Sequence, residues 1–419
     1  MAYMLDSKKI GHFISSRRKN IGLTQQQVAD KLNISFQAVS KWENGTSIPN
    51  TELLVELSEI LDVTVDELLF GEEKSRNQLT YSKAGVDITY TDSIKRDMAK
   101  YLDTADPRVL NRMGAFASLY DIKFDDIKEP VLVMKSEEPG SKQKLAMEYG
   151  YTESICHDMI NHLVNDIIVM GATPLAVLDT IVCGNAEKDT ITTLVKGISD
   201  ACRINECSLV GGETSIQPGV MDKGVYILTS TIVGITEKSN VIDGTQIQED
   251  DAVIAIESNG LHTNGYTLVR LLMEQLPQMK YEMIDKEPFI ESIMKPHTPY
   301  YPALKSILSS KLIHGLAHIT GGGIEGNLSR IIPDKLCAEI DLSTIVPRPV
   351  FHHLKRNGDI SDNEMLSTFN CGVGLVLVVS ETKKDYVMAH ISKYHRCYKI
   401  GNIQRGSKRV SFANQIKWK

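Results

Sequence analysis

Acidic and amide side chains recur along one predicted helix. The run from His157 to Asp166 contains Asp158, Asn161, Asn165 and Asp166 at mostly three- and four-residue spacing, which places side chains along one stripe of a helix. Oxygen ligands of this kind suit Mg²⁺ held together with substrate phosphates. Because acids on a stripe are usually solvated, the same pattern also fits an ordinary exposed helix face.

Two glycine-rich segments have the composition of phosphate-binding loops. LVGGETSIQPG (209–219) predicts a strand followed by a glycine turn and one carboxylate, and ITGGGIEGN (319–327) opens a predicted helix. Glycines let backbone N–H groups approach an anion, and a helix N-terminus favours one. Plain turns fit either pattern as well. The candidate ligand-binding residues are Gly211, Gly212, Glu213, Thr320, Gly321, Gly322 and Gly323.

Short β-branched runs alternate with amphipathic helices from residue 81 onward, which predicts an α/β (α+β) module. The turn-rich segment EKSNVIDGT predicts a boundary near 238–248, and hence two domains, 81–240 and 241–419. The predicted strands are Pro130–Met134, Tyr226–Val233, Ala252–Ile256 and Gly374–Val379. The predicted helices are Ile155–Met170, Thr190–Glu206 and Gly265–Glu274.

The first 71 residues predict an all-α bundle of five helices. The first helix buries Ile10, Phe13 and Ile14 with the aliphatic stem of Arg17, and Gly22 ends it. Thr24 and Gln27 form a capping box at the second helix. Ser35 caps the third, SFQAVSKWE, which turns Ala38, Val39 and Trp42 inward. Glu52–Leu61 and Val65–Phe70 complete the bundle, and the polar run 72–80 predicts a linker.

The run LTQQQVADKLNISFQAVSKWENGTSIPN (23–50) resembles the Xre/Cro/phage-repressor helix-turn-helix family. The resemblance implies that Ser35–Glu43 is the recognition helix, lying in the major groove of double-stranded DNA. Its outward residues would be Phe36, Gln37, Ser40 and Lys41, with Gln37 and Lys41 at base edges, and Gln25 and Asn44 would contact phosphates. A helical dimerisation module that no longer binds DNA is the alternative.

Charge is unevenly distributed in this bundle. All seven Lys and Arg residues before residue 72 precede the end of the third helix, whereas acids gather from Glu43 onward, which predicts a basic DNA face and an acidic back. Few phosphates can be neutralised by one copy, so a single copy should bind poorly. We therefore expect two copies on a palindromic operator.

Five further strings resemble the aminoimidazole ribonucleotide (AIR) synthetases, also called phosphoribosylformylglycinamidine cyclo-ligases. They are AGVDI (84–88), CSLVGGET (207–214), SNGLHTNGYTLVR (258–270), AHITGGG (317–323) and TFNCGVG (368–374). The resemblance covers nearly all of 81–405. It implies an enzyme fold that uses ATP and Mg²⁺ to phosphorylate the formyl oxygen of formylglycinamidine ribonucleotide before the imidazole ring closes. It also implies a homodimer whose amino-terminal halves share a sheet.

By the same resemblance, Asp158, Asn165, Asp166 and Glu213 would serve metal and phosphates. His262 and Asn264 would be candidate catalytic residues on the substrate side, and glycine-rich contacts would come from 321–323 and from Asn370, Cys371 and Gly372. Two of these sets have alternatives from the residues alone. His262 could be a hydrogen-bonded turn histidine, and 370–374 a tight turn before a strand.

One family motif, D-G-V-G-T-K, is altered. Its positions hold Glu137, Glu138, Pro139, Gly140, Ser141 and Lys142. By the resemblance Glu137 would replace a metal-binding aspartate, and Lys142 is retained as a candidate catalytic residue. Proline fixes φ and removes a donor, and two adjacent carboxylates repel a polyphosphate unless a metal bridges them.

These features favour a regulator that binds ATP or a purine-pathway nucleotide and couples it to DNA binding. An active cyclo-ligase tethered to DNA and a non-catalytic dimerisation scaffold are the alternatives. The net charge of −7 gives no general attraction to nucleic acid. Apolar runs shorter than the roughly 18 residues of a membrane span, and no signal-peptide pattern, predict a cytoplasmic protein without membrane contact.

Overall fold

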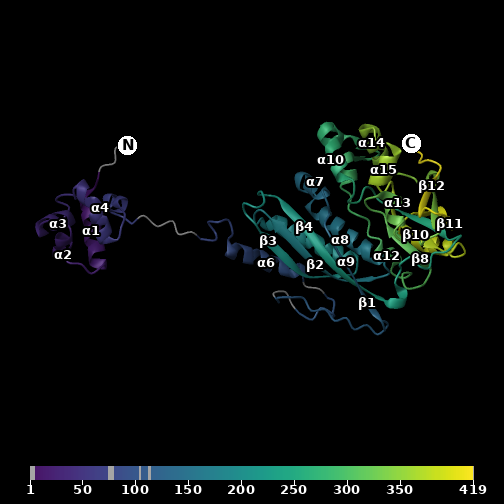
Figure 1. Cartoon of the computed structure of the whole chain (residues 1–419), viewed down its shortest axis with the longest axis horizontal. Helices are drawn as coiled ribbons and strands as arrows, with labels where there is room; N and C mark the ends of the chain where they lie inside the picture. The colour runs from purple at the N-terminus through teal and green to yellow at the C-terminus, as the bar shows by residue number, and fades with distance from the viewer. Residues whose placement is uncertain (1–4, 74–79, 103–104, 112–114, 419) are drawn as a thin grey trace. The chain divides into compact units, whose positions relative to one another are not determined.

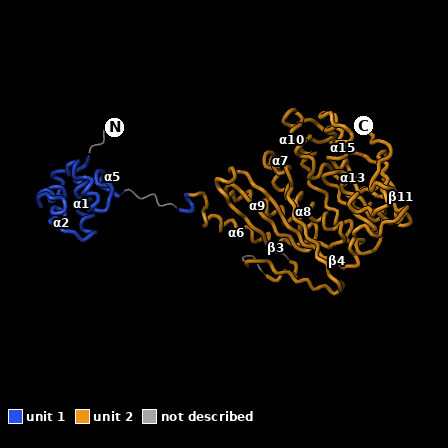
Figure 2. The backbone as a smooth tube through the Cα atoms, in the orientation of Figure 1, with its two compact units in different colours: residues 1–83 blue, residues 84–419 orange. Residues whose placement is uncertain are grey.

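The computed structural model describes residues 5–73, 80–102, 105–111 and 115–418 (Figure 1). Two compact units divide the chain, residues 1–83 and 84–419 (Figure 2). Most of the predicted linker at 72–80 lies outside the described residues. Among the helices of the described part, none combines the length and apolar character that crossing a membrane requires.

The first unit confirms the predicted five-helix bundle. Its buried core is made of aliphatic residues with Phe13 and Trp42. The capping box at Thr24 and Gln27 is present, whereas Ser35 stands at the N-cap of the third helix without a side-chain cap bond. The elements are α1 (Ser7–Asn20), α2 (Gln25–Lys31), α3 (Phe36–Glu43), a 3₁₀ turn (Thr51–Leu53), α4 (Leu54–Leu61) and α5 (Val65–Phe70).

The arginine that α1 buries is Arg18, not the predicted Arg17. Arg18 is 8% exposed because its guanidinium forms an ion pair with Glu43 at the end of α3. Arg17 instead bonds Glu73 and the carbonyl of Asp62. Apolar spacing gives the phase of a helix, but it does not show which neighbouring arginine has a buried partner.

The first half of the second unit is a four-stranded sheet. Its order is β1-β4-β2-β3, with β2 and β3 parallel and the other pairs antiparallel. The helices α8 and α9 pack on one face of this sheet. The elements are α6 (Ile88–Leu102), β1 (Pro130–Glu137), α7 (Lys142–Tyr149), α8 (Thr152–Ile168), β2 (Thr173–Cys183), α9 (Lys188–Ile204), β3 (Ser208–Ile216) and β4 (Tyr226–Glu237).

The second half is built on a six-stranded sheet of order β12-β9-β11-β5-β10-β8. Its strands are β5 (Ala252–Glu257), β8 (Ile313–His318), β9 (Leu336–Asp341), β10 (Val373–Val379), β11 (Cys397–Arg405) and β12 (Val410–Ala413). Its helices are α10 (Tyr266–Gln275), α11 (Phe289–Ile293), α12 (Tyr301–Leu304), α13 (Gly323–Leu328), α14 (Pro349–Gly358), α15 (Asp362–Thr368) and α16 (Lys384–Ile391). A small pair, β6 (Met283–Ile284) and β7 (Glu287–Pro288), and short 3₁₀ turns at 238–240, 277–281 and 342–344 complete the described elements.

The predicted glycine turn at 211–212 is wrong, because β3 continues through it to Ile216. Gly211 and Gly212 pair with Leu178 and Asp179 of β2. A Cβ at Gly212 would lie 2.0 Å from the Asp179 side chain. The second glycine therefore makes room for a neighbouring carboxyl inside a sheet.

The face of the first sheet that turns away from α8 and α9 carries exposed apolar side chains. Leu132 and Met134 project from β1, Leu178 from β2 and Ile227 from β4, and each is more than 40% exposed. Strand alternation places their neighbours Val177 and Leu228 in the core instead. This half is thus covered by helices on one face. The other face is covered in part by Tyr120, Phe124 and Ile127 and is open at the four exposed apolar residues.

Candidate functional site

A fully buried ion pair joins the end of the altered loop to α8. Lys142, the first residue of α7, donates from Nζ to Oδ1 of Asp158 at 2.9 Å, and Oδ2 of the same carboxylate lies 2.7 Å from Nζ in the ion pair. The same ammonium bonds the carbonyls of His262, at 3.1 Å, and of Lys295, at 2.7 Å. Lys142 therefore holds both halves of the unit together.

Burial affects both members of this pair. It lowers the pKa of Lys142 and raises the pKa of Asp158 to about 6, while their mutual attraction opposes each shift. The remaining contact of the carboxylate is the backbone N–H of His297, at 2.9 Å from Oδ1. Asp158 is thus enclosed by protein donors.

The polar stripe predicted on α8 is not solvated. Asn161 donates to the carbonyl of His297 at 2.6 Å, and Asn165 donates to the carbonyl of Thr298 at 2.9 Å. Both asparagines are buried. The stripe therefore binds the segment that follows α11, and in this way fixes the second half of the unit against the first.

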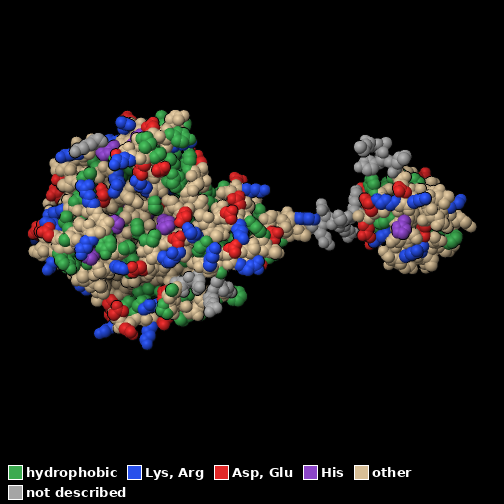
Figure 3. Space-filling model, turned by 180° about the vertical axis from the view of Figure 1, so that it is seen from behind, with side chains coloured by type: hydrophobic (Ala, Val, Ile, Leu, Met, Phe, Trp, Pro, Cys, Tyr) green, Lys and Arg blue, Asp and Glu red, His purple; other side chains and the backbone are tan. Residues whose placement is uncertain are grey.

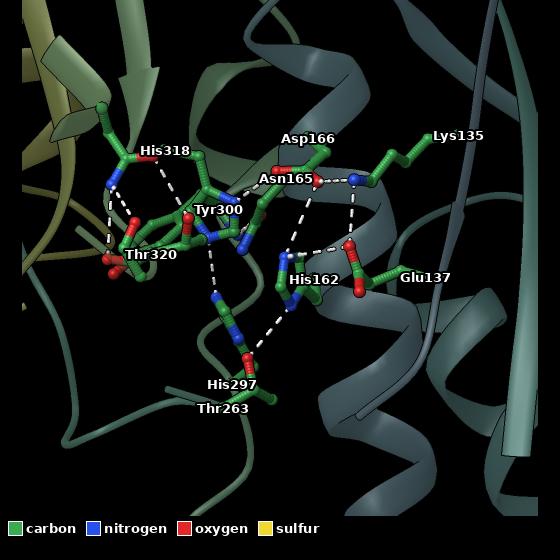
Figure 4. A network of polar contacts seen from close by, with 12 residues as sticks. Lys135, Glu137, His162, Asn165, Asp166, Thr263, His297, Tyr300, His318 and Thr320 are labelled. Atoms are coloured by element: carbon green, nitrogen blue, oxygen red, sulfur yellow. Dashed lines mark hydrogen bonds and ion pairs between the residues drawn. The ribbon is translucent and has the colours of Figure 1, made fainter. Parts of the chain in front are cut away.

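A second group of charges lies where β1 meets α8 (Figure 4). The ammonium of Lys135 lies 2.9 Å from Oε2 of Glu137 and 3.2 Å from Oδ2 of Asp166. Burial alone would lower the pKa of Lys135, but its bond to Glu137 and the charge of Asp166 raise it. A side chain of the protein thus already places positive charge between the two carboxylates.

Histidines surround the same carboxylates. His318 Nδ1 lies 2.7 Å from Oδ1 of Asp166, and its Nε2 lies 2.8 Å from Nε2 of His297. The Nε2 atom of His162 lies 3.6 Å from Asp166 and 3.9 Å from Glu137. Burial lowers the pKa of His162, and the charge of His318 lowers it further.

His262 joins this cluster by stacking on His297, with ring centroids 3.8 Å apart. It is buried, it adopts φ +61°, and its Nε2 contacts Thr298 Oγ1 at 3.1 Å. Burial lowers the pKa of both His262 and His297 well below the usual value. These imidazoles are therefore neutral near pH 7.

The structure brings together some of the predicted metal ligands and separates others. Glu137 and Asp166 share Lys135, but Asp158 lies two helical turns, about 12 Å, from Asp166 along α8 and has a different cation. Glu213 is exposed on the edge strand β3. No hydrogen bond or ion pair within the described part of the chain links Glu213 to the histidine cluster.

The predicted substrate-side residue Asn264 lies beside the glycine turn that precedes α13. Asn264 Nδ2 is buried and has no hydrogen-bond partner among the described residues, and its Oδ1 lies beside Gly321. Gly321 and Gly322 are exposed at the start of α13, Gly323 is buried, and Thr320 bonds Asn327. A groove of about 510 Å³ begins one residue beyond Asn264; its lining includes Gly265, Thr267, Arg270, Glu364 and Thr368.

The 370–374 segment is a buried turn before β10. Asn370 accepts from Ser258 Oγ and from the N–H of Gly372, and donates to the carbonyl of Gly260. Cys371 is buried with φ +48°. The Asn370 side chain thus closes the turn and joins it to the segment 258–260.

Sequence reasoning did not select Lys135, His162, His297 or His318. Three of them had a local signal: Lys135 is two residues from Glu137, His162 is four residues from Asp166, and His318 belongs to the string AHITGGG. His297 had none, because only the tertiary fold brings it to α8.

In the first unit, α3 presents most of its predicted DNA-reading side chains to solvent. Phe36, Gln37, Lys41 and Asn44 are exposed, and Ser40 is partly exposed. Gln25, the predicted phosphate contact, is partly exposed and donates to Glu43 Oε2 at 2.8 Å. Burial would raise the pKa of Glu43, but bonds from Arg18, Gln25 and Ser15 hold it below its usual value.

The predicted basic face is reduced by ion pairing. Lys9 pairs with Glu72, Arg17 with Glu73 and Arg18 with Glu43. Fewer cations than the sequence suggests are therefore available for DNA phosphates. On the face of the larger unit shown in Figure 3, Lys and Arg are interspersed with Asp and Glu.

Comparison with known families agrees with this architecture. Residues 14–68 match a helix-turn-helix family, residues 127–236 match the family described as AIR synthase related protein, N-terminal domain, and residues 248–413 match its C-terminal domain. The phosphoribosylformylglycinamidine cyclo-ligase of Methylobacillus flagellatus is 37% identical over 331 residues, covering 78% of this chain and 95% of that protein. The cyclo-ligase of Geobacillus kaustophilus is 38% identical over 339 residues, covering 80% and 97%.

Solved structures share the fold of the larger unit at low identity. A thiamine-monophosphate kinase from Stenotrophomonas maltophilia aligns with a TM-score of 0.56 at 16% identity, covering 80% of this chain and 98% of that chain. HypE from E. coli, a hydrogenase maturation protein, aligns with a TM-score of 0.57 at 17% identity, covering 78% and 94%. The chain therefore belongs to the AIR synthase related family, with a helix-turn-helix domain on its N-terminal side.

Proposed function

We propose that this protein is a DNA-binding regulator whose AIR synthase-like unit binds ATP or a purine-pathway nucleotide and couples that binding to DNA. The helix-turn-helix match and the exposed side chains on α3 support the DNA part. The cyclo-ligase relatives support the nucleotide part, as does a HypE structure of the same fold described in complex with ATP. The unpartnered Asn264 amide and the neighbouring groove offer contacts for such a ligand.

The observation that carries the regulatory role is the position of Lys135. Its ammonium lies between Glu137 and Asp166, which resemblance assigns to the metal. Phosphoryl transfer depends on positioning and on metal charge at the phosphates. A lysine ammonium at this point, next to the Glu138–Pro139 loop, competes with a metal ion for the two carboxylates and so favours ligand binding over turnover.

The residues present do not fit the Mg²⁺ site that the family implies. Mg²⁺ requires near-octahedral oxygen coordination. Asp158 is enclosed in its pair with Lys142, Lys135 lies between Glu137 and Asp166, and two imidazoles line the same space. Of the four predicted carboxylates, only Glu137 and Asp166 come together.

For ligand binding to change DNA affinity, the two recognition helices of a dimer must be able to adopt two arrangements. We infer a homodimer, supported by the apolar outer face of the first sheet and by the resemblance to dimeric enzymes. Two copies would present two α3 helices to a palindromic operator. A ligand can shift DNA affinity only if it binds one arrangement more tightly than the other.

The test uses the full-length protein and duplexes selected from a random DNA library. Binding to the selected duplex is measured with and without ATP, AMP or formylglycinamidine ribonucleotide. We expect at least one of these to change DNA affinity severalfold, and Gln37→Ala with Lys41→Ala to weaken binding more than about tenfold, since each base contact contributes about 1–3 kcal/mol. Selection of no duplex, or an affinity that no nucleotide changes, would contradict the proposal.

An active, DNA-tethered cyclo-ligase is the second candidate. The 37–38% identity over 95–97% of the length of cyclo-ligases favours it. Steady formation of aminoimidazole ribonucleotide from ATP, Mg²⁺ and formylglycinamidine ribonucleotide would establish catalysis and replace the regulator proposal. A scaffold role would instead leave the thermal unfolding midpoint unchanged by every nucleotide tested, because a ligand that binds the native state stabilises it.

A further inference from the structure

Two imidazoles and a carboxylate meet at the junction of α8 and β8. One potential ligand atom from each of His162, Asp166 and His318 lies within 4.8 Å of the other two. His162 and Asp166 are one helical turn apart and project from the same side of α8. Glu137 approaches the same point from β1, with Oε2 3.9 Å from His162 Nε2.

We propose that His162, Asp166 and His318, with Glu137 as a fourth ligand, form a binding site for a borderline divalent transition-metal ion, best represented by Zn²⁺. Zn²⁺ accepts four ligands from histidine nitrogens and carboxylate oxygens. A mixed set of two nitrogens and two oxygens selects against Mg²⁺, which prefers oxygen alone. The proposal is independent of nucleotide binding and of catalysis.

Both histidines are oriented by contacts at the ring nitrogen opposite the proposed ligand atom. His162 Nδ1 contacts Thr263 Oγ1 at 3.0 Å, which leaves Nε2 facing the carboxylates. His318 Nε2 contacts His297 Nε2 at 2.8 Å, which leaves Nδ1 facing Asp166. Metal-binding histidines are held in this way, because such a contact fixes the ring and its tautomer.

Lys135 is the cation that a metal ion would replace. Its ammonium lies between the two carboxylates, but its side chain is 38% exposed and can turn outward. Lys135 should therefore compete with the metal ion rather than prevent its binding.

A partly buried pair elsewhere in the larger unit shows how an ordinary histidine–carboxylate contact is built. His314 Nδ1 lies 2.8 Å from Asp251 Oδ2. Within the described residues, this pair belongs to no group of three potential metal ligands. His314 is therefore a matched control for adventitious binding by histidine.

The test is direct metal binding to the full-length, tag-free protein after removal of bound metal. Co²⁺ is titrated while its visible absorption bands are recorded, and Zn²⁺ then displaces it. We expect one Co²⁺ per chain with the band intensity of four-coordinate geometry. His162→Leu and Asp166→Asn should each weaken binding more than about 100-fold, and Thr263→Val about tenfold, as losses of outer contacts commonly do.

Two further variants keep the proposal testable if a ligand variant does not fold. Lys135→Met removes the competing ammonium and leaves every proposed ligand in place, so it should bind Co²⁺ more tightly than the wild type. His314→Asn should leave affinity unchanged. Failure of the wild type to bind, an unaltered affinity in folded His162→Leu, weaker binding in Lys135→Met, or equal displacement by Mg²⁺ would each overturn the assignment.

Discussion

Lys142 and Asp158 form an ion pair in which neither side chain is exposed to solvent, with Nζ 2.7 Å from Oδ2. The resemblance makes Lys142 a candidate catalytic residue. Here the lysine donates hydrogen bonds to three oxygens of the protein, Oδ1 of Asp158 and the carbonyls of His262 and Lys295. The residue that ends the altered loop thus has a structural role whatever else it does.

Removing Lys142 should therefore destabilise the larger unit. Lys142→Met leaves Asp158 buried without a counter-charge, and loss of one partner of a buried pair costs about 3–5 kcal/mol. The double variant Lys142→Met, Asp158→Asn should recover part of that loss. Urea unfolding of the full chain, followed by circular dichroism, measures both; equal midpoints for wild type and Lys142→Met would contradict the expected role.

Much of the fold follows from periodicity and turn chemistry. The helix over 65–70 and the cap at Thr24 were predicted as the structure has them, and predicted strand positions in β1, β4, β5 and β10 lie within the observed strands. Local signals suffice here because capping bonds and β-branched runs act over a few residues. The strand predicted to end at Met134 continues to Glu137 in β1. The prediction stopped early because Lys135 and Glu137 are polar, and their ion pairs with α8 are not visible in the sequence.

The site was less predictable, because its residues are spread over distant parts of the chain. Asp166 meets His318 across 152 positions, and Asp158 meets the N–H of His297 across 139. The spacing of Asp158 and Asp166 on α8 predicted that both carboxylates would serve one metal site. It could not show that one carboxylate would face a buried lysine and the other a group of histidines.

The buried pair in the DNA-binding unit gives a second stability prediction. Arg18→Met should destabilise that unit by about 3–5 kcal/mol, because Glu43 is nearly unexposed and loses its bidentate partner. Lys9→Met breaks the exposed pair with Glu72 and should cost no more than about 1 kcal/mol. Thermal unfolding reports the difference. A loss from Lys9→Met as large as that from Arg18→Met would contradict the assignment.

Asp179 should make stability depend on pH. Burial raises its pKa to about 7 from an ordinary 3.8. Between these values the folded state holds more proton than the unfolded state, so stability falls by up to about 1.4 kcal/mol per pH unit as pH rises from about 4 to 7, and then levels off. Asp179→Asn should remove this slope and be the more stable form at pH 8. Asp125→Asn, at an exposed position, is the control and should leave the slope of stability against pH unchanged. A variant slope equal to that of wild type would be contrary to the prediction.

The open face of the first sheet predicts how the protein assembles. If a second copy covers it, Met134 and Leu178 become buried in both copies, and each apolar side chain contributes about 1.5–3 kcal/mol. Leu178→Lys should then weaken self-association more than tenfold, since about 1.4 kcal/mol corresponds to a factor of ten. Leu271→Lys, at an exposed position on α10, should have no such effect.

Sedimentation equilibrium measures the association, and binding to the selected palindrome should weaken in parallel because one recognition helix neutralises few phosphates. A wild-type chain that stays monomeric at tens of micromolar would rule out this role for the face.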